Sequence, residues 1–237
     1  MSAASERRGS ARTAVVWDTL RPMLDGRGLD VLDVGGGTGG FAVRVAGLGH
    51  RVSVVDPSPD ALAALDRRAR EQGVVVEGRQ GDLSSLLDVA GSSAADVVLC
   101  HGVLEVVEDP AAALAVLREV LRPGGRLSLL VAQRNAAVIA RAMAGHFAQA
   151  AALLDDTTST GRTGRRFTLA EAEQLLTDAG FTVAASHGVR VFSDLVPGSL
   201  LDLEPGAAGA LVELERAVAS RAEFVPLATQ LHLVAER

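Results

Sequence analysis

A glycine-rich loop between two apolar segments is the part of the sequence best suited to hold a ligand. Residues 31–40 read VLDVGGGTGG, and the helical pattern FAVRVAGL follows directly. Glycine lets a backbone approach a ligand where a Cβ would collide, and the N-terminus of a helix presents unpaired N–H groups. We therefore expect a cofactor to contact this loop at Gly35, Gly36 and Gly37.

Three aspartates flank the loop at positions where a carboxylate could bind a nucleoside. Asp33 lies two residues before the first glycine, Asp56 ends the segment RVSVVD, and Asp82 follows the segment VVVEGRQG. A carboxylate only accepts hydrogen bonds, so Asp56 suits two ribose hydroxyls. The simpler alternatives are that Asp33 orients the loop through backbone hydrogen bonds and that Asp82 caps a helix over 83–88.

The glycine spacing by itself fits two cofactor classes. Gly35, Gly37 and Gly40 also satisfy the G-x-G-x-x-G pattern of dinucleotide-binding folds. The three acids favour a different nucleoside cofactor, so nicotinamide binding is the minor alternative.

Strand-like and helix-like segments alternate along the chain, which is typical of a parallel sheet with helices on both faces. The predicted strands are 30–34, 51–55, 74–78, 95–100, 126–131, 181–191 and 227–235. The predicted helices are 13–24, 38–48, 59–72, 110–122, 135–147 and 167–179, with a further one around Leu211, Leu214 and Val218. Residues 155–166, which are rich in Thr, Ser, Gly and Arg, predict a loop.

Composition limits the classes of function. The chain has 237 residues, 48% hydrophobic and 22% charged, with a net charge of −6, which predicts one globular domain. A single cysteine, Cys100, predicts neither a disulfide framework nor a metal site and favours the reducing cytoplasm. No run is long enough to span a membrane, and the polar segment 1–12 lacks the apolar core of a signal peptide. The acidic charge argues against broad coating of nucleic acid but leaves room for a local basic patch.

Longer sequence motifs indicate a particular protein family. The loop and acids resemble those of class I S-adenosylmethionine-dependent methyltransferases. The phrases HGVLEVVEDP at 101–110, LRPGGRLSLL at 121–130 and GVRVFSD at 188–194, with AMAGHF at 142–147 and LVELE at 211–215, are similar to the bacterial tRNA 5-carboxymethoxyuridine methyltransferases. That family esterifies the carboxylate of a modified wobble uridine, and the resemblance runs from about residue 8 to residue 234.

The resemblance implies a Rossmann-like α/β fold with a seven-stranded sheet, mostly parallel with the last strand antiparallel, and a helical lid insertion. It implies one domain, divided into an N-terminal helix or lid (1–28), a cofactor-binding core (29–132), a lid insertion with a mobile loop (133–166) and the C-terminal part of the sheet (167–237). The oligomeric state cannot be inferred from the sequence.

The resemblance also implies site residues. S-adenosylmethionine is the implied cofactor and S-adenosylhomocysteine the product. The implied cofactor-binding residues are Arg12, Asp33, Gly35, Gly36, Gly37, Asp56, Pro57, Gly81, Asp82, Leu83 and His101, with His101 also the catalytic candidate beside the sulfonium. A satisfied histidine at a strand end is the simpler explanation of His101. Arg190 and Arg134 are candidate clamps for the acceptor's carboxylate.

The sequence departs from the family where the acceptor would bind. Relatives have a lysine-rich tract where this chain reads LLDDTTSTGR at 153–162, so fewer phosphate contacts are expected. The chain also has no tyrosine, so a base-stacking platform would need another side chain. Three hypotheses stay open: a tRNA carboxylate methyltransferase, a small-molecule O- or N-methyltransferase whose lid encloses a metabolite, and a non-catalytic cofactor-binding protein.

Overall fold

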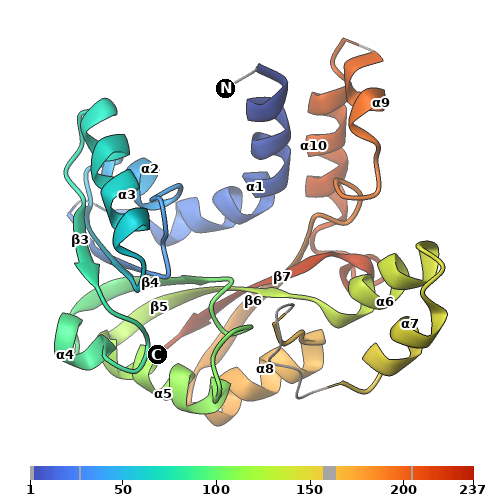
Figure 1. Ribbon diagram of the computed structural model, residues 1–237. Helices are drawn as coiled ribbons and strands as arrows, with labels where there is room; N and C mark the ends of the chain where they lie inside the picture. Colours follow the sequence, from blue (N-terminus) through green and yellow to red (C-terminus); the bar gives the residue numbers. More distant parts are fainter. Residues whose placement is uncertain (1–2, 27, 157–163, 204) are drawn as a thin grey trace. The chain divides into compact units, whose positions relative to one another are not determined.

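The computed structural model describes residues 3–26, 28–156, 164–203 and 205–237, with side chains described from residue 13 onward except at 202 and 203 (Figure 1). Seven strands form one sheet in the order β3-β2-β1-β4-β5-β7-β6. The strands are β1 (Asp30–Val34), β2 (Arg51–Asp56), β3 (Glu77–Gln80), β4 (Ala95–His101), β5 (Leu121–Ala132), β6 (Thr182–Val189) and β7 (Gln230–Glu236). The sheet is mixed, mostly parallel with the end of the chain antiparallel, which confirms the predicted α/β class.

The helices connect these strands in the expected alternation. They are α1 (Ala3–Met23), α2 (Ala42–Ala46), α3 (Pro59–Glu71), α4 (Leu86–Ala90), α5 (Pro110–Val120), α6 (Arg134–Met143), α7 (Phe147–Leu153), α8 (Leu169–Asp178), α9 (Gly198–Leu203) and α10 (Ala207–Val218), with a short 3-10 helix at Val225–Leu227. No helix in the described part of the chain is both long and apolar enough to cross a membrane.

The chain forms two compact units. The larger unit comprises Met23–Leu130, Glu173–Ala185 and Leu233–Arg237, and the second comprises Met1–Pro22, Val131–Ala172 and Ser186–His232. The sequence-based division of one domain at residues 28, 132 and 166 stays a prediction.

The larger unit contains the parallel part of the sheet. Strands β1 to β5 pair in parallel, and β1 lies between β2 and β4. Figure 1 shows α2 and α3 on one side of these strands and α4 and α5 on the other. Such an arrangement buries both faces of the central strands, and Val97, Val98 and Leu99 of β4 are at most 1% exposed.

Local sequence signals explain where the longer helices of this unit begin. The Ser58 hydroxyl accepts a hydrogen bond from the Ala61 N–H at 3.2 Å, and Pro59 is the first residue of α3. Asp109 accepts from the N–H groups of Ala111 and Ala112 at the start of α5. In both helices a capping side chain precedes a proline at the first helical position, which is a favourable helix start.

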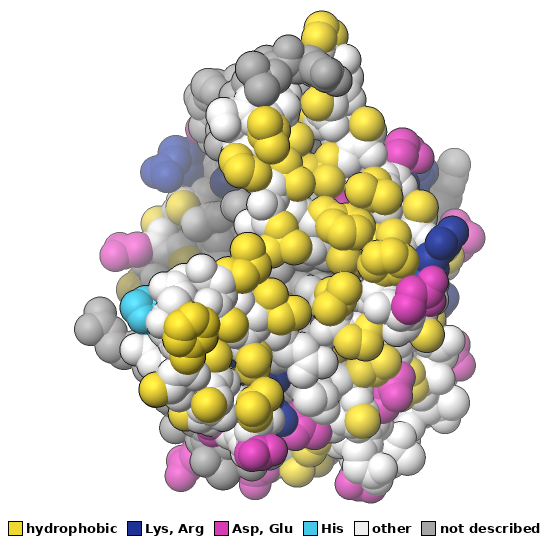
Figure 2. All heavy atoms as spheres, turned by 90° about the vertical axis from the view of Figure 1, so that its right-hand side faces the viewer, with side chains coloured by type: hydrophobic (Ala, Val, Ile, Leu, Met, Phe, Trp, Pro, Cys, Tyr) yellow, Lys and Arg dark blue, Asp and Glu magenta, His cyan; other side chains and the backbone are white. Residues whose placement is uncertain are grey.

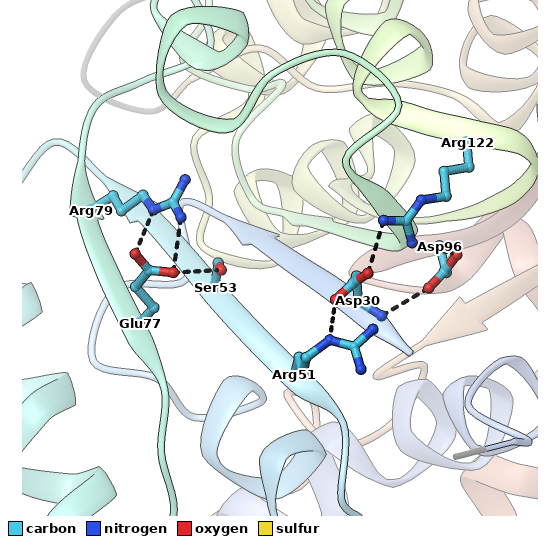
Figure 3. Close-up of polar contacts among 7 residues, drawn as sticks. All are labelled: Asp30, Arg51, Ser53, Glu77, Arg79, Asp96 and Arg122. Atoms are coloured by element: carbon cyan, nitrogen blue, oxygen red, sulfur yellow. Dashed lines mark hydrogen bonds and ion pairs between the residues drawn. The ribbon is translucent and has the colours of Figure 1, made fainter. Parts of the chain in front are cut away.

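A charged network joins the amino ends of four strands, as Figure 3 shows. Asp30 of β1 binds Arg51 of β2 at 2.6 Å and Arg122 of β5 at 2.8 Å. Arg122 also binds Asp96 of β4, whose other oxygen accepts the Asp30 N–H. The hydrogen bond from Arg51 is the main reason why the pKa of Asp30 is lowered. The network fixes where these strands begin, and their opposite ends are left for the site.

The prediction that the third strand begins at Val74 was wrong, because β3 begins three residues later, at Glu77. Val74 instead takes part in the turn that ends α3. The Val74 N–H donates to the Ala69 carbonyl at 3.0 Å and the Gly73 N–H to Arg70 at 3.1 Å, a Schellman ending. Val75 is 89% exposed, and pairing begins only at Glu77, opposite Ser53. The apolar run at 74–76 therefore indicated a strand where the chain makes a helix end.

Glycines account for two further corrections. The helix predicted over 38–48 is regular only from Ala42 to Ala46, because Gly39 has a φ of +76° and the loop continues as turns. The helix predicted over 135–147 breaks into α6 and α7 at Gly145, whose φ is +78°. An L-residue side chain disfavours such backbone angles, so α2 begins only after Gly39 and α6 stops before Gly145. Helices α7 and α9 were not predicted.

Polar side chains organise the second unit from inside. Arg134, 6% exposed, binds both Glu171 oxygens at 2.8 Å, while Glu171 and Thr168 cap the start of α8 reciprocally. Burial alone would raise the pKa of Glu171, but hydrogen bonds from Thr168 and Arg134 hold it below its usual value. The Gln133 amide donates to the carbonyls of Val225 and Ala228.

Glu215 of α10 is fully buried and holds the turn that follows β6. Its carboxylate accepts from the N–H groups of Val191, Phe192 and Ser193 at 2.7 to 2.9 Å and from the Ser193 hydroxyl at 2.6 Å. Without the carboxylate the buried Val191 N–H and the half-buried donors of Phe192 and Ser193 would lose their acceptor, and each buried unsatisfied group costs about 1–3 kcal/mol.

We expect Glu215→Ala to lower the free energy of unfolding by about 3 kcal/mol, because one buried and three half-buried hydrogen bonds are lost together. Denaturant unfolding measures this. The matched control is Glu213→Ala on the same helix, which removes an exposed ion pair with Arg216 and should cost at most about 1 kcal/mol. Equal losses in the two variants would contradict the assigned role of Glu215.

Candidate functional site

A cavity of about 610 Å³ opens at the carboxyl ends of the parallel strands of the larger unit. That volume is in the range of small-molecule sites, and the cavity lies where β1 separates β2 from β4, the place where open α/β sheets bind ligands. Its lining comprises Val34, Gly35, Val55, Asp56, Pro57, Gly81, Asp82, Leu83, Ser84, Gly102, Val103, Val106, Val107, Glu108, Asp109, Ala112, Ala113 and Val116.

The structure brings six of the predicted residues together in this lining. They are Gly35, Asp56, Pro57, Gly81, Asp82 and Leu83. Gly36 and Gly37 lie in the same loop as Gly35, and Asp33 lies near the end of β1, but these three residues are not part of the lining. Arg12 belongs to α1, and its side chain lies outside the described residues.

Asp56 connects the glycine loop to the start of α3. Its carboxylate accepts from the Gly37 N–H and from the Ser58 N–H, both at 2.9 Å. Each carboxylate oxygen has a further lone pair, so Asp56 can still accept hydrogen bonds from two hydroxyl groups of a ligand. Asp56 is only 7% exposed, so the packing around its side chain fixes the direction in which its remaining lone pairs point.

The glycines of the loop are required by close packing as well as by backbone angles. A Cβ on Gly35 would lie 2.5 Å from Val103 Cγ2, and one on Gly36 would lie 2.6 Å from the Asp33 carboxylate. Gly35 and Gly37 have φ values of +69° and +55°. Position 35 therefore requires glycine, and the backbone of Gly35 forms part of the cavity wall.

Asp33 lies beneath the loop. It is 3% exposed, and burial together with the nearby charge of Asp56 raises the pKa of Asp33 to about 7. Its position under Gly36 fits the simpler alternative, in which Asp33 supports the loop.

Asp82 performs the local role expected of a cap. Its carboxylate accepts from the Ser84 N–H at 2.9 Å, the Ser84 hydroxyl at 2.6 Å and the Ser85 N–H at 3.2 Å, in the turn before α4. The hydrogen bond from Ser84 is the main reason why the pKa of Asp82 is lowered. Asp82 also lines the cavity, so capping and ligand contact are compatible in one residue.

His101 ends β4, one residue before the cavity wall. Its Nε2 lies 2.8 Å from Ser128 Oγ on β5, and its ring packs edge-on against Phe41 with the ring centroids 4.9 Å apart. Burial lowers the pKa of His101 to about 4, so the imidazole is neutral at pH 7. The next residue, Gly102, lines the cavity and donates its N–H to Leu130 at 2.9 Å.

The two candidate anion clamps lie in the second unit, where each pairs with a carboxylate of the protein. Arg134 binds Glu171, as described above. Arg190 has a left-handed backbone, with a φ of +61°, and its guanidinium lies 2.5 Å from Asp194. Both positive charges are therefore already neutralised by neighbouring acids.

The apolar wall of the cavity was not predicted from the sequence. Val103, Val106 and Val107 follow β4, and Ala112 and Val116 belong to α5. The only signal was the phrase GVLEVV at 102–107, which places apolar residues outside the strand and helix patterns. Val106, which is 69% exposed, offers an apolar surface on which a flat ring could lie.

These features together fit a nucleoside cofactor. The cavity combines an apolar wall with an acid that keeps free acceptors, and a Cβ at Gly35 would fill part of it. Among the described residues, no group of His, Cys, Asp and Glu side chains could hold a metal ion.

Comparisons with known proteins agree with this geometry. A family model described as a methyltransferase domain matches residues 32–129. The tRNA 5-carboxymethoxyuridine methyltransferase of Escherichia coli is 30% identical over 97% of this chain and 89% of its own. A ubiquinone biosynthesis O-methyltransferase of Xanthomonas axonopodis is 36% identical over 52% of this chain and 51% of its own.

Solved structures show the same fold. Magnesium protoporphyrin IX methyltransferase from Synechocystis, solved with bound S-adenosylhomocysteine, is 19% identical, with a TM-score of 0.62 covering 100% of this chain and 88% of that one. The cofactor of this chain is S-adenosylmethionine. The chain belongs to the class I S-adenosylmethionine-dependent methyltransferases, in the family of the Escherichia coli tRNA 5-carboxymethoxyuridine methyltransferase.

Proposed function

We propose that this enzyme methylates the carboxylate of 5-carboxymethoxyuridine in tRNA, as the name of its Escherichia coli relative describes. The observation that supports this best is the extent of the similarity, which covers 97% of the chain and so includes the second unit as well as the cofactor-binding core. The same proposal places the enzyme in the cytoplasm.

The proposed cofactor site uses the cavity of the larger unit. Asp56 accepts from the ribose hydroxyls, and Gly81, Asp82 and Leu83 border the adenine with Pro57. Gly35, Gly36 and Gly37 let the backbone approach the cofactor, with Asp33 supporting them. By resemblance, Arg12 binds the cofactor's carboxylate.

The reaction needs alignment more than proton transfer. The cofactor supplies a methyl group bound to a positively charged sulfur. A carboxylic acid ordinarily has a pKa of about 4, so the acceptor is already ionised at neutral pH and no base is required. What the protein contributes is a shaped, water-poor site with the reacting groups in line.

In this proposal His101 positions the end of β4 beside the methyl donor. Ser128 and Phe41 fix the ring, and the peptide that follows forms the cavity wall at Gly102. A neutral imidazole adds no positive charge next to a sulfonium. His101 therefore acts as a positioning group, without giving up or taking a proton.

A small-molecule acceptor is the second candidate. The pairing of Arg134 with Glu171 and of Arg190 with Asp194 leaves neither guanidinium as an uncompensated charge for an anionic acceptor. The ubiquinone biosynthesis relatives, which match about half of the chain, act in small-molecule metabolism by their names.

The deciding measurement is methyl transfer from radiolabelled S-adenosylmethionine to tRNA that carries 5-carboxymethoxyuridine. We expect label in the RNA as a base-labile ester, and none in tRNA that lacks the carboxylate. Nucleoside mass analysis identifies the product. Absence of transfer to this RNA, with transfer to a metabolite extract, would establish the second candidate instead.

Asp56→Ala should weaken S-adenosylmethionine binding roughly 10- to 100-fold, because hydrogen bonds to a charged group contribute about 1.5–3 kcal/mol. Calorimetry measures the dissociation constant, and a thermal melt checks that the loop remains folded. Asp60→Asn, at an exposed position near the start of α3, is the control and should bind normally. Normal binding by Asp56→Ala would remove Asp56 from the proposed site.

His101→Ala should lower kcat roughly 10- to 100-fold through misalignment. His101→Gln keeps a hydrogen-bonding group near Ser128 and should recover part of this loss. Because the pKa of His101 is lowered to about 4, the imidazole stays neutral between about pH 6 and 8, and the kcat profile should keep its shape in both variants. Full turnover with unchanged cofactor affinity in His101→Ala would exclude a role in the mechanism.

A further inference from the structure

One aromatic side chain differs from all others in this protein by its exposure. The chain has six phenylalanines, one tryptophan and no tyrosine, and all seven rings lie in the described part of the structure. Phe147 is 71% exposed, whereas Trp17, Phe41, Phe167, Phe181, Phe192 and Phe224 are buried or half-buried. A single exposed apolar side chain is common on a protein surface, but the neighbouring helix α6 also exposes Ile139 and Met143, and a group of exposed apolar side chains marks a contact site.

The backbone presents this ring on a defined turn. Gly145, with a φ of +78°, ends α6 in a Schellman motif: its N–H donates to Ala142 at 3.0 Å, and the His146 N–H donates to Arg141 at 2.9 Å. The Ala150 N–H then donates to His146 at 2.9 Å as α7 begins. Phe147 is the first residue of α7, so its backbone is fixed on both sides before any partner binds.

The residues next to the ring in the sequence, 142–154, include no Asp, Glu, Lys or Arg. Met143 at the end of α6 is 73% exposed. Figure 2 shows hydrophobic side chains gathered on the side of the molecule where Figure 1 labels α6 and α7. A flat ring of a partner could therefore lie on Phe147 without desolvating a charge.

Charge in the same segment favours an anionic partner. Apart from the Arg134–Glu171 pair, the described residues 131–156 and 164–172 carry a formal charge of +1, in a chain whose net charge is −6. The charged side chains are Arg141, Arg165, Arg166, Asp155 and Asp156. A partner that offers both flat rings and negative charge is single-stranded RNA, whose unpaired bases stack on aromatic side chains. An uncharged apolar metabolite or a lipid chain would use the ring but would gain nothing from the positive segment.

We propose that Phe147 is the base-stacking platform of this enzyme and that it contacts an unpaired base of the anticodon loop of its tRNA. The inference rests on the proposed function and adds the residue that recognises the RNA in a chain without tyrosine. Base stacking on an aromatic side chain contributes about 1–3 kcal/mol, so removing the ring should weaken RNA binding about 5- to 150-fold.

The test measures binding of a fluorescently labelled anticodon stem–loop RNA, carrying 5-carboxymethoxyuridine, to the protein saturated with S-adenosylhomocysteine. Phe147→Ala and Phe147→Leu should both raise the dissociation constant by that factor, and Phe147→Trp should bind like the wild type. Leu154→Ala is the matched control, because Leu154 is a 57% exposed apolar residue just after α7 without a ring. It should bind normally.

Three results would overturn the proposal. Normal binding by Phe147→Ala excludes the contact, normal binding by Phe147→Leu shows that an apolar side chain suffices, and an equal loss in Leu154→Ala shows a general apolar surface. Methyl transfer by the wild-type enzyme distinguishes a failure of the stacking role from a failure of the proposed function. If the wild type methylates the RNA but the Phe147 variants bind normally, only the stacking role fails. If the wild type neither binds nor methylates the RNA, the proposed function fails and the stacking role with it.

Discussion

The hydrogen bonds of one carboxylate connect the elements on which the cofactor site depends. Asp56 ends β2, accepts from Gly37 in the loop after β1 and from Ser58 at the start of α3, and lines the cavity. Three elements thus meet at a single acceptor that still has lone pairs for a ligand. Because the strands run in parallel, their carboxyl ends lie at the same edge, and a residue that ends β2 can bind backbone that follows β1.

Charge is used differently in different parts of the protein. At the amino ends of the parallel strands, four charged side chains satisfy one another and fix the strand starts, whereas the carboxyl ends keep space and unfilled acceptors. In the second unit, Glu215 and Glu171 bind backbone N–H groups, so they organise turns and helix starts. What this unit leaves exposed includes the apolar side chains of Met143 and Phe147. Such a surface can supply contact area to an acceptor that brings its own charge.

The sequence by itself was sufficient for the sheet class, for a ligand at the glycine loop and for two of the five polar residues that line the cavity, Asp56 and Asp82, because these follow from local rules. The identity of the cofactor came from the family resemblance. A strand that ends at glycines, an acid that closes the next strand, and caps such as Ser58 and Asp109 each depend on a few neighbouring residues. Family phrases added His101, whose neighbours Ser128 and Phe41 could not be read from the sequence, because they lie on other elements.

Only the tertiary structure decided the rest. The hydrogen bonds that end α3 at Val74 and α6 at Gly145 form within the folded backbone. An apolar run or a helical period in the sequence does not show where such hydrogen bonds form. Arg134 looked like a free cation in the sequence, whereas folding brings Glu171, 37 residues away, onto its guanidinium. The exposure of Phe147 is likewise a result of packing, because the burial of a side chain is set by residues distant in the chain.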